Sequence, residues 1–324
     1  MPNDHRALHS TRLRRTTPAP RPTVDADHGP RVPRTPPRAP LVGTLLAALL
    51  VTVAGCAPAS DSAKGSADDT ASPASCAVDD LDTKTKGKLT IGTDKPAYAP
   101  WFEDDDPSNG KGFESAVAYA VADRLGFTKE QVVWRTVPFN SSFAPGKKSF
   151  DFDINQVSIS NARTRSVDFS SGYYTVRQAV VTLKKSRYAE ARDIAGLKGA
   201  KLGAQVGTTS LDIVTDVIKP GPKPAVYQKS DYVKEALRNG QVDGVVLDLP
   251  TAFYVVSAEV TDATIVGQLP DPSDKAEQFG LVLDKDSPLT RCVSEAVDEL
   301  RRDGVLKRLE KKWLRQAVSA PELT

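Results

Sequence analysis

The chain contains 324 residues, of which 43 are basic and 41 acidic, and its formal net charge at pH 7 is +2. A charge so near zero gives no indication of a nucleic-acid partner. All three histidines (His5, His9 and His28) precede Cys56, so the chain beyond that cysteine lacks the residue needed for Ser-His-Asp or Cys-His nucleophiles and for His-ligated metal sites. Paired carboxylates could still perform acid–base chemistry, so catalysis is disfavoured without being excluded. We therefore expect neither an enzyme nor a bound metal or cofactor.

The first 55 residues are typical of a secretion signal. Residues 41–54 are uncharged and mostly apolar; they are too few to span a bilayer but suit the central region of a signal peptide. The basic segment before them is unusually long, so translation could start near Val32. The run ends in Val53-Ala54-Gly55-Cys56, the pattern of a bacterial lipobox, which predicts cleavage before Cys56 and lipidation of its thiol. A chance cysteine after an uncleaved signal anchor is the alternative.

Residues 56–85 are predicted to form a flexible tether behind the lipidated cysteine. Much of this stretch is rich in Ser, Ala, Asp and Pro and has too few apolar residues to bury. The sequence therefore places the protein outside the cytoplasm, held at the outer face of the cell membrane by its N-terminal lipid.

Two cysteines remain once Cys56 is assigned to the lipid. In an extracytoplasmic compartment Cys76 and Cys292 more often form a disulfide than stay as thiols. Such a bond would join the start of the folded part to a C-terminal helix. Closing so long a loop stabilises by roughly 4 kcal/mol in the chain-entropy model.

From about residue 86 short apolar strands alternate with amphipathic helices. In chain order we expect a strand at 88–93, a helix at 113–125, strands at 132–137 and 201–206, a helix from Ser210, a strand at 225–228, a helix at 231–238, strands at 244–248, 265–266 and 279–284, and two C-terminal helices. The first of these two helices would open with Ser287-Pro288 and have its proline in the first position, and the second would cover 305–314. This alternation predicts an α/β architecture with more than one core.

The segment from Asp151 to Tyr174 contains a candidate binding site. Its first residues, DFDI (151–154), alternate acidic and apolar side chains, which predicts a strand with one buried face. The alternation slips at Asn155-Gln156, as at a bulge or a strand end that redirects polar side chains.

A carboxylate site is predicted just beyond this slip. Ser160 has the character of a helix N-cap, which would put Arg163 in the first helical turn. Helix N-terminal amides and a guanidinium, beside the hydroxyl of Ser158, would together bind a small organic acid. An ordinary strand–helix join with a surface arginine is the alternative.

Seven motifs occur in order along the folded part: KLTIGTD (88–94) with Pro100-Trp101, GFESAVAYAVADRLG (112–126), ISNARTRSVDFSSGYY (159–174), DIAGLKGAKLGAQVGTTS (193–210), VDGVVLDLPTAFY (242–254), EQFGLVLDKDSPL (277–289) and DGVLKRLEKKWL (303–314). Each is weak alone. Together they make the chain resemble the family-3 solute-binding proteins of bacterial amino-acid ABC transporters, such as the glutamine-, histidine- and lysine/arginine/ornithine-binding proteins.

The resemblance implies a type II periplasmic-binding-protein-like α/β fold, in which two lobes joined by two crossing hinge segments close around a ligand. Lobe 1 would comprise residues 88–174 and 280–316, and lobe 2 residues 178–276. The crossings would lie near residues 174–177 and 277–280.

The resemblance also implies a site for a zwitterion. Arg163, with Ser158 beside it, would clamp the α-carboxylate, and Asp248 would bind the α-ammonium. Thr208 and Thr209 would meet the carboxylate from lobe 2. The walls around the ligand side chain would be Asp94, Tyr98 (shifted by an apparent one-residue insertion), Trp101 and Phe139.

Several of these assignments have structural alternatives. Asp248 could cap the next helix, Asp94 could serve turn geometry alone, and Trp101 and Phe139 could be core aromatics. Gln156, with Asn155, occupies a position that is often small in the family, so we expect a narrower or more polar pocket floor and include Gln156 among the ligand-binding residues.

We thus expect a monomeric receptor that binds a polar amino acid and delivers it to ABC permease subunits. Asp94 favours a ligand whose side chain donates hydrogen bonds, such as Gln, His, Arg or Lys. The alternatives on the same fold are a secreted cyclohexadienyl-dehydratase-like enzyme and an amino-acid sensor without a transport role.

Overall fold

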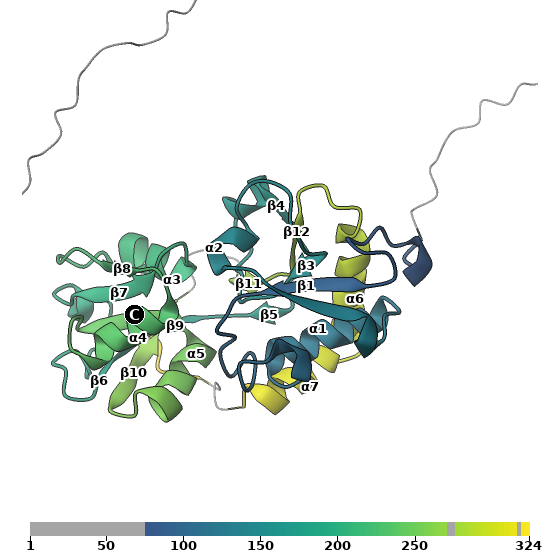
Figure 1. Cartoon of the computed structure of the whole chain (residues 1–324). Coiled ribbons are helices and arrows are strands. Elements are labelled where there is room, and N and C mark those ends of the chain that lie inside the picture. The colour runs from purple at the N-terminus through teal and green to yellow at the C-terminus, as the bar shows by residue number, and fades with distance from the viewer. Residues whose placement is uncertain (1–74, 271–275, 316–318) are drawn as a thin grey trace, which may run out of the picture. The chain divides into compact units, whose positions relative to one another are not determined.

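The computed structural model describes residues 75–270, 276–315 and 319–324, which all belong to a single unit of the chain. Two five-stranded sheets and a two-stranded ribbon organise it (Figure 1), which confirms the predicted two-lobed α/β fold. The predicted signal peptide, Cys56 and the tether up to residue 74 lie outside the described residues. Within the described part, no helix has the length and apolar character required to cross a membrane.

The first sheet has the strand order β2-β1-β3-β12-β4. Its strands are β1 (Leu89–Thr93), β2 (Val132–Thr136), β3 (Phe152–Asp153), β4 (Val167–Phe169) and β12 (Val282–Asp284). The helices α1 (Phe113–Arg124), α6 (Thr290–Arg302) and α7 (Val305–Trp313) contribute to one hydrophobic core with β1, β3 and β12. Residues far apart in sequence therefore share this core.

The second sheet has the order β10-β6-β9-β7-β8. Its strands are β6 (Gln178–Leu183), β7 (Leu202–Gln205), β8 (Ala225–Tyr227), β9 (Gly244–Asp248) and β10 (Ala263–Gln268). The helices α3 (Thr209–Asp212), α4 (Ser230–Arg238) and α5 (Leu249–Tyr254) follow β7, β8 and β9, and the π-helical segments η6 (Ile213–Ile218) and η7 (Val255–Glu259) extend α3 and α5. Two hydrophobic clusters contain alternating residues of this sheet. The sheet is thus buried on both faces, as its near-continuous apolar strands require.

Two short strands cross between the sheets as an antiparallel ribbon, β5 (Tyr174–Thr175) and β11 (Gln278–Phe279). The single strand predicted at 279–284 is therefore wrong, because β11 and β12 belong to different sheets. Gly280 separates them where the chain passes very close to Ile159, since a Cβ at Gly280 would lie 2.8 Å from Ile159 Cγ1.

The strand expected to have one buried face is buried on both. Asp151 and Asp153 are 2% and 0% exposed. The Asp151 carboxylate accepts the backbone N–H groups of Lys84 and Thr90, each at 2.6 Å, so its place in the core is secured by hydrogen bonds that an alternating pattern does not reveal. The slip after it is a strand end, where Gln156 has a positive φ of 49°.

The helix expected to open with Ser287-Pro288 begins instead at Thr290. Ser287 caps the preceding turn, because its hydroxyl accepts from Leu289 N (3.3 Å) and its carbonyl from Thr290 N (3.1 Å). Pro288 therefore lies in this turn and not at the first helical position. The remaining short elements are α2 (Phe139–Ser142) and the 3-10 turns η1 (Val78–Asp80), η2 (Pro107–Asn109), η3 (Lys129–Gln131), η4 (Arg163–Arg165) and η5 (Ala195–Leu197).

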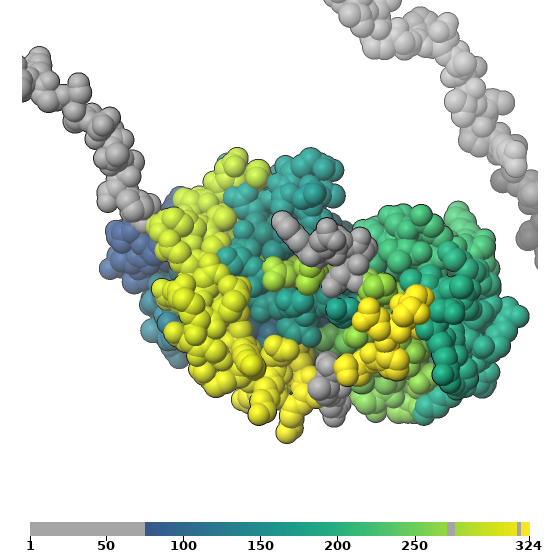
Figure 2. All heavy atoms as spheres, turned by 180° about the vertical axis from the view of Figure 1, so that it is seen from behind, coloured from purple at the N-terminus to yellow at the C-terminus, as the bar shows by residue number. Residues whose placement is uncertain are grey.

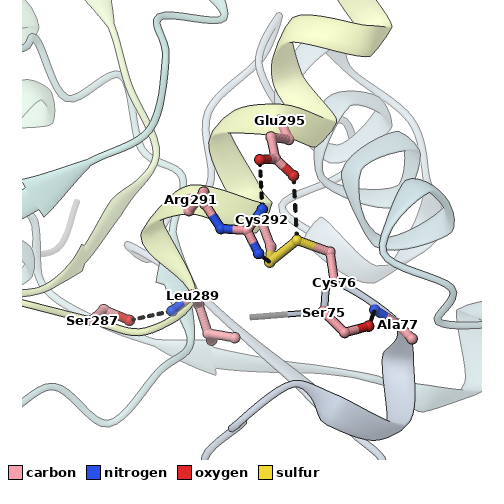
Figure 3. Close-up of a disulfide and its surroundings, with 8 residues drawn as sticks. All are labelled: Ser75, Cys76, Ala77, Ser287, Leu289, Arg291, Cys292 and Glu295. Atoms are coloured by element: carbon pink, nitrogen blue, oxygen red, sulfur yellow. Dashed lines mark hydrogen bonds and ion pairs between the residues drawn. A yellow bond between two sulfur atoms is a disulfide. The ribbon is translucent and has the colours of Figure 1, made fainter. Parts of the chain in front are cut away.

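The predicted disulfide is present (Figure 3) and joins Cys76 to Cys292 on α6. Arg291 and Glu295 pair beside it, with 2.6 Å between Nη1 and Oε1. Val78 and Leu81, within the stretch expected to be tether, pack on the core of the first sheet. The bond therefore adds a covalent link to an N-terminal segment that also packs on this core.

Replacing Cys76 and Cys292 together by serine should lower the free energy of unfolding by about 2–4 kcal/mol, because the denatured chain regains the freedom that this long loop closure removes. Urea unfolding of the oxidised wild type and of the double variant measures the difference. Equal midpoints would contradict a stabilising role.

The C-terminal residues return to the second sheet. Figure 2 shows residues 319–324, in bright yellow, on the green part of the chain that carries this sheet. Gln268 at the end of β10 donates to Pro321 O (2.8 Å) and accepts from Leu323 N (2.9 Å), while Leu323 is fully buried. A Cβ at Gly267 would lie 2.7 Å from Leu323 Cγ, so the glycine makes room for this tail.

Leu323→Ala should destabilise the protein by about 2–5 kcal/mol, since it leaves a cavity in a closed core. The expected result is a lower thermal midpoint in calorimetry. The matched variant Thr324→Ala, which changes the exposed last residue, should leave the midpoint unchanged.

Candidate functional site

The ten residues predicted to bind a ligand all line two adjoining hollows. Nine of them, all except Trp101, line the first hollow, which we call the arginine hollow because Arg163 lies in its wall. The second, which we call the lysine hollow, is lined in part by Trp101 and Lys234. Tyr98, Gln156 and Asp248 are among the residues that line both, so the two hollows form one continuous cleft. The structure thus brings the ten residues together, and their contact with a ligand stays a prediction.

Arg163 is buried, with 8% of its surface exposed, which rules out the surface-arginine alternative. Its Nη1 donates to Ser158 O (2.6 Å) and its Nη2 to Gly207 O (2.8 Å). The guanidinium also lies over the Phe143 ring, 4.4 Å from its centroid. Burial lowers the pKa of Arg163, whereas the nearby carboxylates Glu277, Asp212 and Asp248 raise it.

The α-helix expected to begin at Ser160 is absent. Arg163–Arg165 form a single 3-10 turn, although the Ser160 hydroxyl does accept the Arg163 N–H at 3.3 Å. A turn this short does not present a helix N-terminus to an anion. The positive charge at this end of the cleft therefore comes from the guanidinium itself.

The hydroxyl groups predicted to meet a ligand carboxylate already form hydrogen bonds within the protein. Thr208 caps α3 by accepting from Leu211 N (3.2 Å), and it donates to Gln205 O (2.8 Å). Ser158 and Thr209 both donate to Oε1 of Glu277, at 2.5 and 2.7 Å. Glu277 was not among the predicted site residues.

Asp248 ends β9 beside the cleft. Its Oδ1 accepts from Gln178 Nε2 (2.7 Å), and Gln178 Oε1 in turn accepts from Ser210 Oγ (2.7 Å). Desolvation raises the pKa of Asp248 to about 8, and the neighbouring charge of Glu277 adds to this shift. An incoming ammonium group would favour the ionised form.

Gln156 is held in place from behind by Glu114, which is fully buried. The Glu114 carboxylate accepts the Gln156 backbone N–H (2.8 Å) and also hydrogen-bonds the Gln156 side-chain amide and the Tyr173 hydroxyl. Desolvation raises the pKa of Glu114 to about 7. Glu114 thus holds Gln156 in place at the cleft, and the role of Gln156 in ligand binding stays a prediction.

The predicted walls combine structural contacts with exposure to the cleft. Trp101 is 0% exposed, and its indole N–H donates to Thr251 Oγ1 at 2.9 Å. Asp94 accepts the backbone N–H of Lys95 (2.7 Å) and of Phe139 (3.2 Å), so it does serve the turn. Both residues still line the cleft.

Lys234 lies at the far end of the lysine hollow and was not foreseen. Its side chain is 9% exposed and lies 3.0 Å from Asp231 Oδ1 and 2.9 Å from Glu259 Oε2. Its ammonium also lies 4.4 Å from the centroid of the Tyr98 ring. Hydropathy cannot indicate a buried lysine in an amphipathic helix, whereas Glu277 could have been noted as the acid at the predicted crossing.

No cluster of His, Cys, Asp and Glu suited to a metal ion occurs in the described ranges. The cleft instead offers one buried guanidinium near one end, carboxylates along it and aromatic walls. This arrangement suits a small polar molecule that carries both charges.

The family model for bacterial extracellular solute-binding proteins, family 3, matches residues 89–316, well over half of the chain. The chain belongs to this family. Its two-lobed fold is that of a family-3 solute-binding protein.

The L-cystine-binding protein TcyJ of Escherichia coli (strain K12) is 26% identical over 232 residues, which cover 71% of this chain and 84% of the relative. The arginine-binding extracellular protein ArtP of Bacillus subtilis (strain 168) is 29% identical over 234 residues, or 70% and 86%. A solved ancestral arginine-binding protein bound to arginine has a TM-score of 0.58 and 29% identity, covering 70% of this chain and 98% of its own. These similar proteins are named as binding proteins and not as enzymes.

Asp248→Asn should stabilise the unliganded protein increasingly as pH rises. The ordinary carboxyl pKa of 3.8 rises to about 8 in the fold. The protonated Asp248 therefore stabilises the fold fully below pH 3.8, and this stabilisation is lost as pH rises through about 8. Asparagine stays neutral over the whole range. Urea unfolding at pH 5, 7 and 9 should show an advantage that grows to the order of 1–3 kcal/mol.

The control for this comparison is Asp80→Asn, which changes an exposed carboxylate. A difference between Asp248→Asn and wild type that stays constant from pH 5 to 9 would show that Asp248 titrates like a solvated acid.

Proposed function

We propose that this protein is a monomeric, extracytoplasmic receptor that binds a polar α-amino acid in the cleft and delivers it to an ABC importer. The observation that carries the proposal is the placement of Arg163 and Asp248 in the same hollow. A zwitterion offers a carboxylate to the first and an ammonium to the second. Both contacts are charge-assisted hydrogen bonds, which gain strength where water is excluded.

The lysine hollow favours a ligand side chain that donates hydrogen bonds. The two negative charges of Asp231 and Glu259 exceed the single positive charge of Lys234, with which both are paired. Oε2 of Glu259 is buried and accepts no hydrogen bond, although it is ion-paired with Lys234. Relatives named for binding arginine and cystine are consistent with such a ligand.

The proposal includes a lipid anchor at Cys56 and hinge motion about the ribbon β5–β11. In this scheme residues 1–55 are removed as the signal, lobe 1 comprises 88–174 with 280–316, and lobe 2 comprises 178–276. The disulfide supports an oxidising compartment, and the ribbon is a narrow link about which two cores can rotate.

A thermal-shift screen of residues 76–324 against the common amino acids and L-cystine, followed by calorimetry, should identify a stabilising ligand. Arg163→Ala should weaken its binding at least about 100-fold, because the carboxylate loses its buried partner. Arg163→Lys should recover only part of the affinity, since it lacks the planar fork.

The matched control is Arg165→Ala, which removes an exposed arginine from the same turn and should bind normally. A folded protein that no α-amino acid stabilises would refute the proposed function.

A further inference from the structure

Glu277 stands where the chain crosses back from the second sheet to the first. Its backbone is fixed there, because Val176 N donates to Glu277 O (3.0 Å) and Ile159 N donates to Gln278 O (2.8 Å). The side chain extends toward the arginine hollow, where it meets Ser158 beside the first sheet, Gln178 of the second sheet and Thr209 at the start of α3.

The hydroxyl groups that contact Glu277 have few protons to donate. A serine or threonine hydroxyl has one proton to donate and two lone pairs that accept. The Ser158 and Thr209 hydroxyls both donate to Glu277 Oε1. With those protons committed, the two oxygens can only accept from a molecule in the cleft.

We infer that Glu277 is a positioning residue that turns the hydroxyls of Ser158 and Thr209 into acceptors for the ammonium group of the ligand. This reverses the role predicted for them, which was to bind the ligand carboxylate. The inference rests on the proposed function, and it assigns the recognition of ammonium to a larger set of groups than Asp248 alone.

Gln178 extends this arrangement to Asp248. Its amide nitrogen lies 2.7 Å from Asp248 Oδ1 and 3.3 Å from Glu277 Oε2, so it bridges the two carboxylates. An ammonium group has three N–H donors, and Asp248, Ser158 and Thr209 all line the arginine hollow. Three acceptors for three donors favour a primary α-ammonium over a methylated or acylated one.

The ligand carboxylate is then left to Arg163. A guanidinium has five N–H donors, and the bonds to Ser158 O and Gly207 O use only two of them. The carboxylate therefore does not depend on the two hydroxyls.

A different role for Glu277 would be to occupy the place of the ligand carboxylate until a ligand displaces it. The two roles predict opposite effects of removing it. Glu277→Ala should weaken binding if Glu277 orients acceptors, and should strengthen binding if it competes with the ligand.

The first test needs no ligand. Thermal unfolding of wild type, Glu277→Ala, Ser158→Ala and the double variant forms a double-mutant cycle. Because one hydrogen bond joins the two side chains, the double variant should lose less in thermal midpoint than the sum of the two single losses. Additive losses in thermal midpoint would overturn the inference, whether or not the ligand screen identifies a ligand. A failed ligand screen without additive losses would count against the proposed function alone.

The second test compares L-arginine with L-argininamide, which keeps the ammonium, and N-acetyl-L-arginine, which keeps the carboxylate. Glu277→Ala should weaken L-arginine binding and should shift the affinity ratio toward the acetylated probe by about tenfold, because the freed hydroxyls can donate to a carboxylate. Glu277→Gln retains an oxygen that can accept both hydroxyl protons, so it should restore most of the wild-type ratio.

The matched control is Glu190→Ala, which removes an exposed carboxylate that lines neither hollow. Tighter L-arginine binding by Glu277→Ala, or an equal loss for all three probes, would overturn the inference.

Discussion

Burial of one guanidinium is the constraint from which the organisation of the cleft follows. Removing a cation such as Arg163 from water costs several kcal/mol unless other groups replace its hydration. The carbonyls of Ser158 and Gly207 supply this replacement from segments beside different sheets, while three carboxylates lie within electrostatic reach. The charge is therefore well accommodated only where the two halves of the fold approach each other. A binding cleft between them is the natural result.

Acids outnumber cations around this cleft, and the fold tolerates the excess by holding some of them protonated. Desolvation raises the pKa of Asp248 to about 8 and that of Glu114 to about 7, and raises that of Asp153 well above its ordinary value. The unliganded protein thus lacks positive charge where a ligand ammonium would supply it. The excess of acids thus lowers the free energy of unfolding of the unliganded protein, and a bound ligand would restore it. Such a loss of stability is common at functional sites.

The elements with strong periodicity were predictable, and the cleft was predictable only through its resemblance to a family. Strand and helix positions such as β9 and α1 followed from apolar spacing. The burial of Asp151 and Lys234 did not, because each is offset by partners distant in sequence: Asp151 by the backbone amides of Lys84 and Thr90, and Lys234 by Glu259. The proton arrangement at Ser158 depends in the same way on Glu277, more than a hundred residues away.

The C-terminal tail has a consequence for how this protein behaves among other copies of itself. β10 is an edge strand of the second sheet, and an unpaired edge is a template for adding a foreign strand. The tail lies against the Gln268 end of that edge, forms a parallel bridge there through Glu322 and anchors itself with Leu323. The last residues of the chain thereby shield part of the edge from intermolecular pairing.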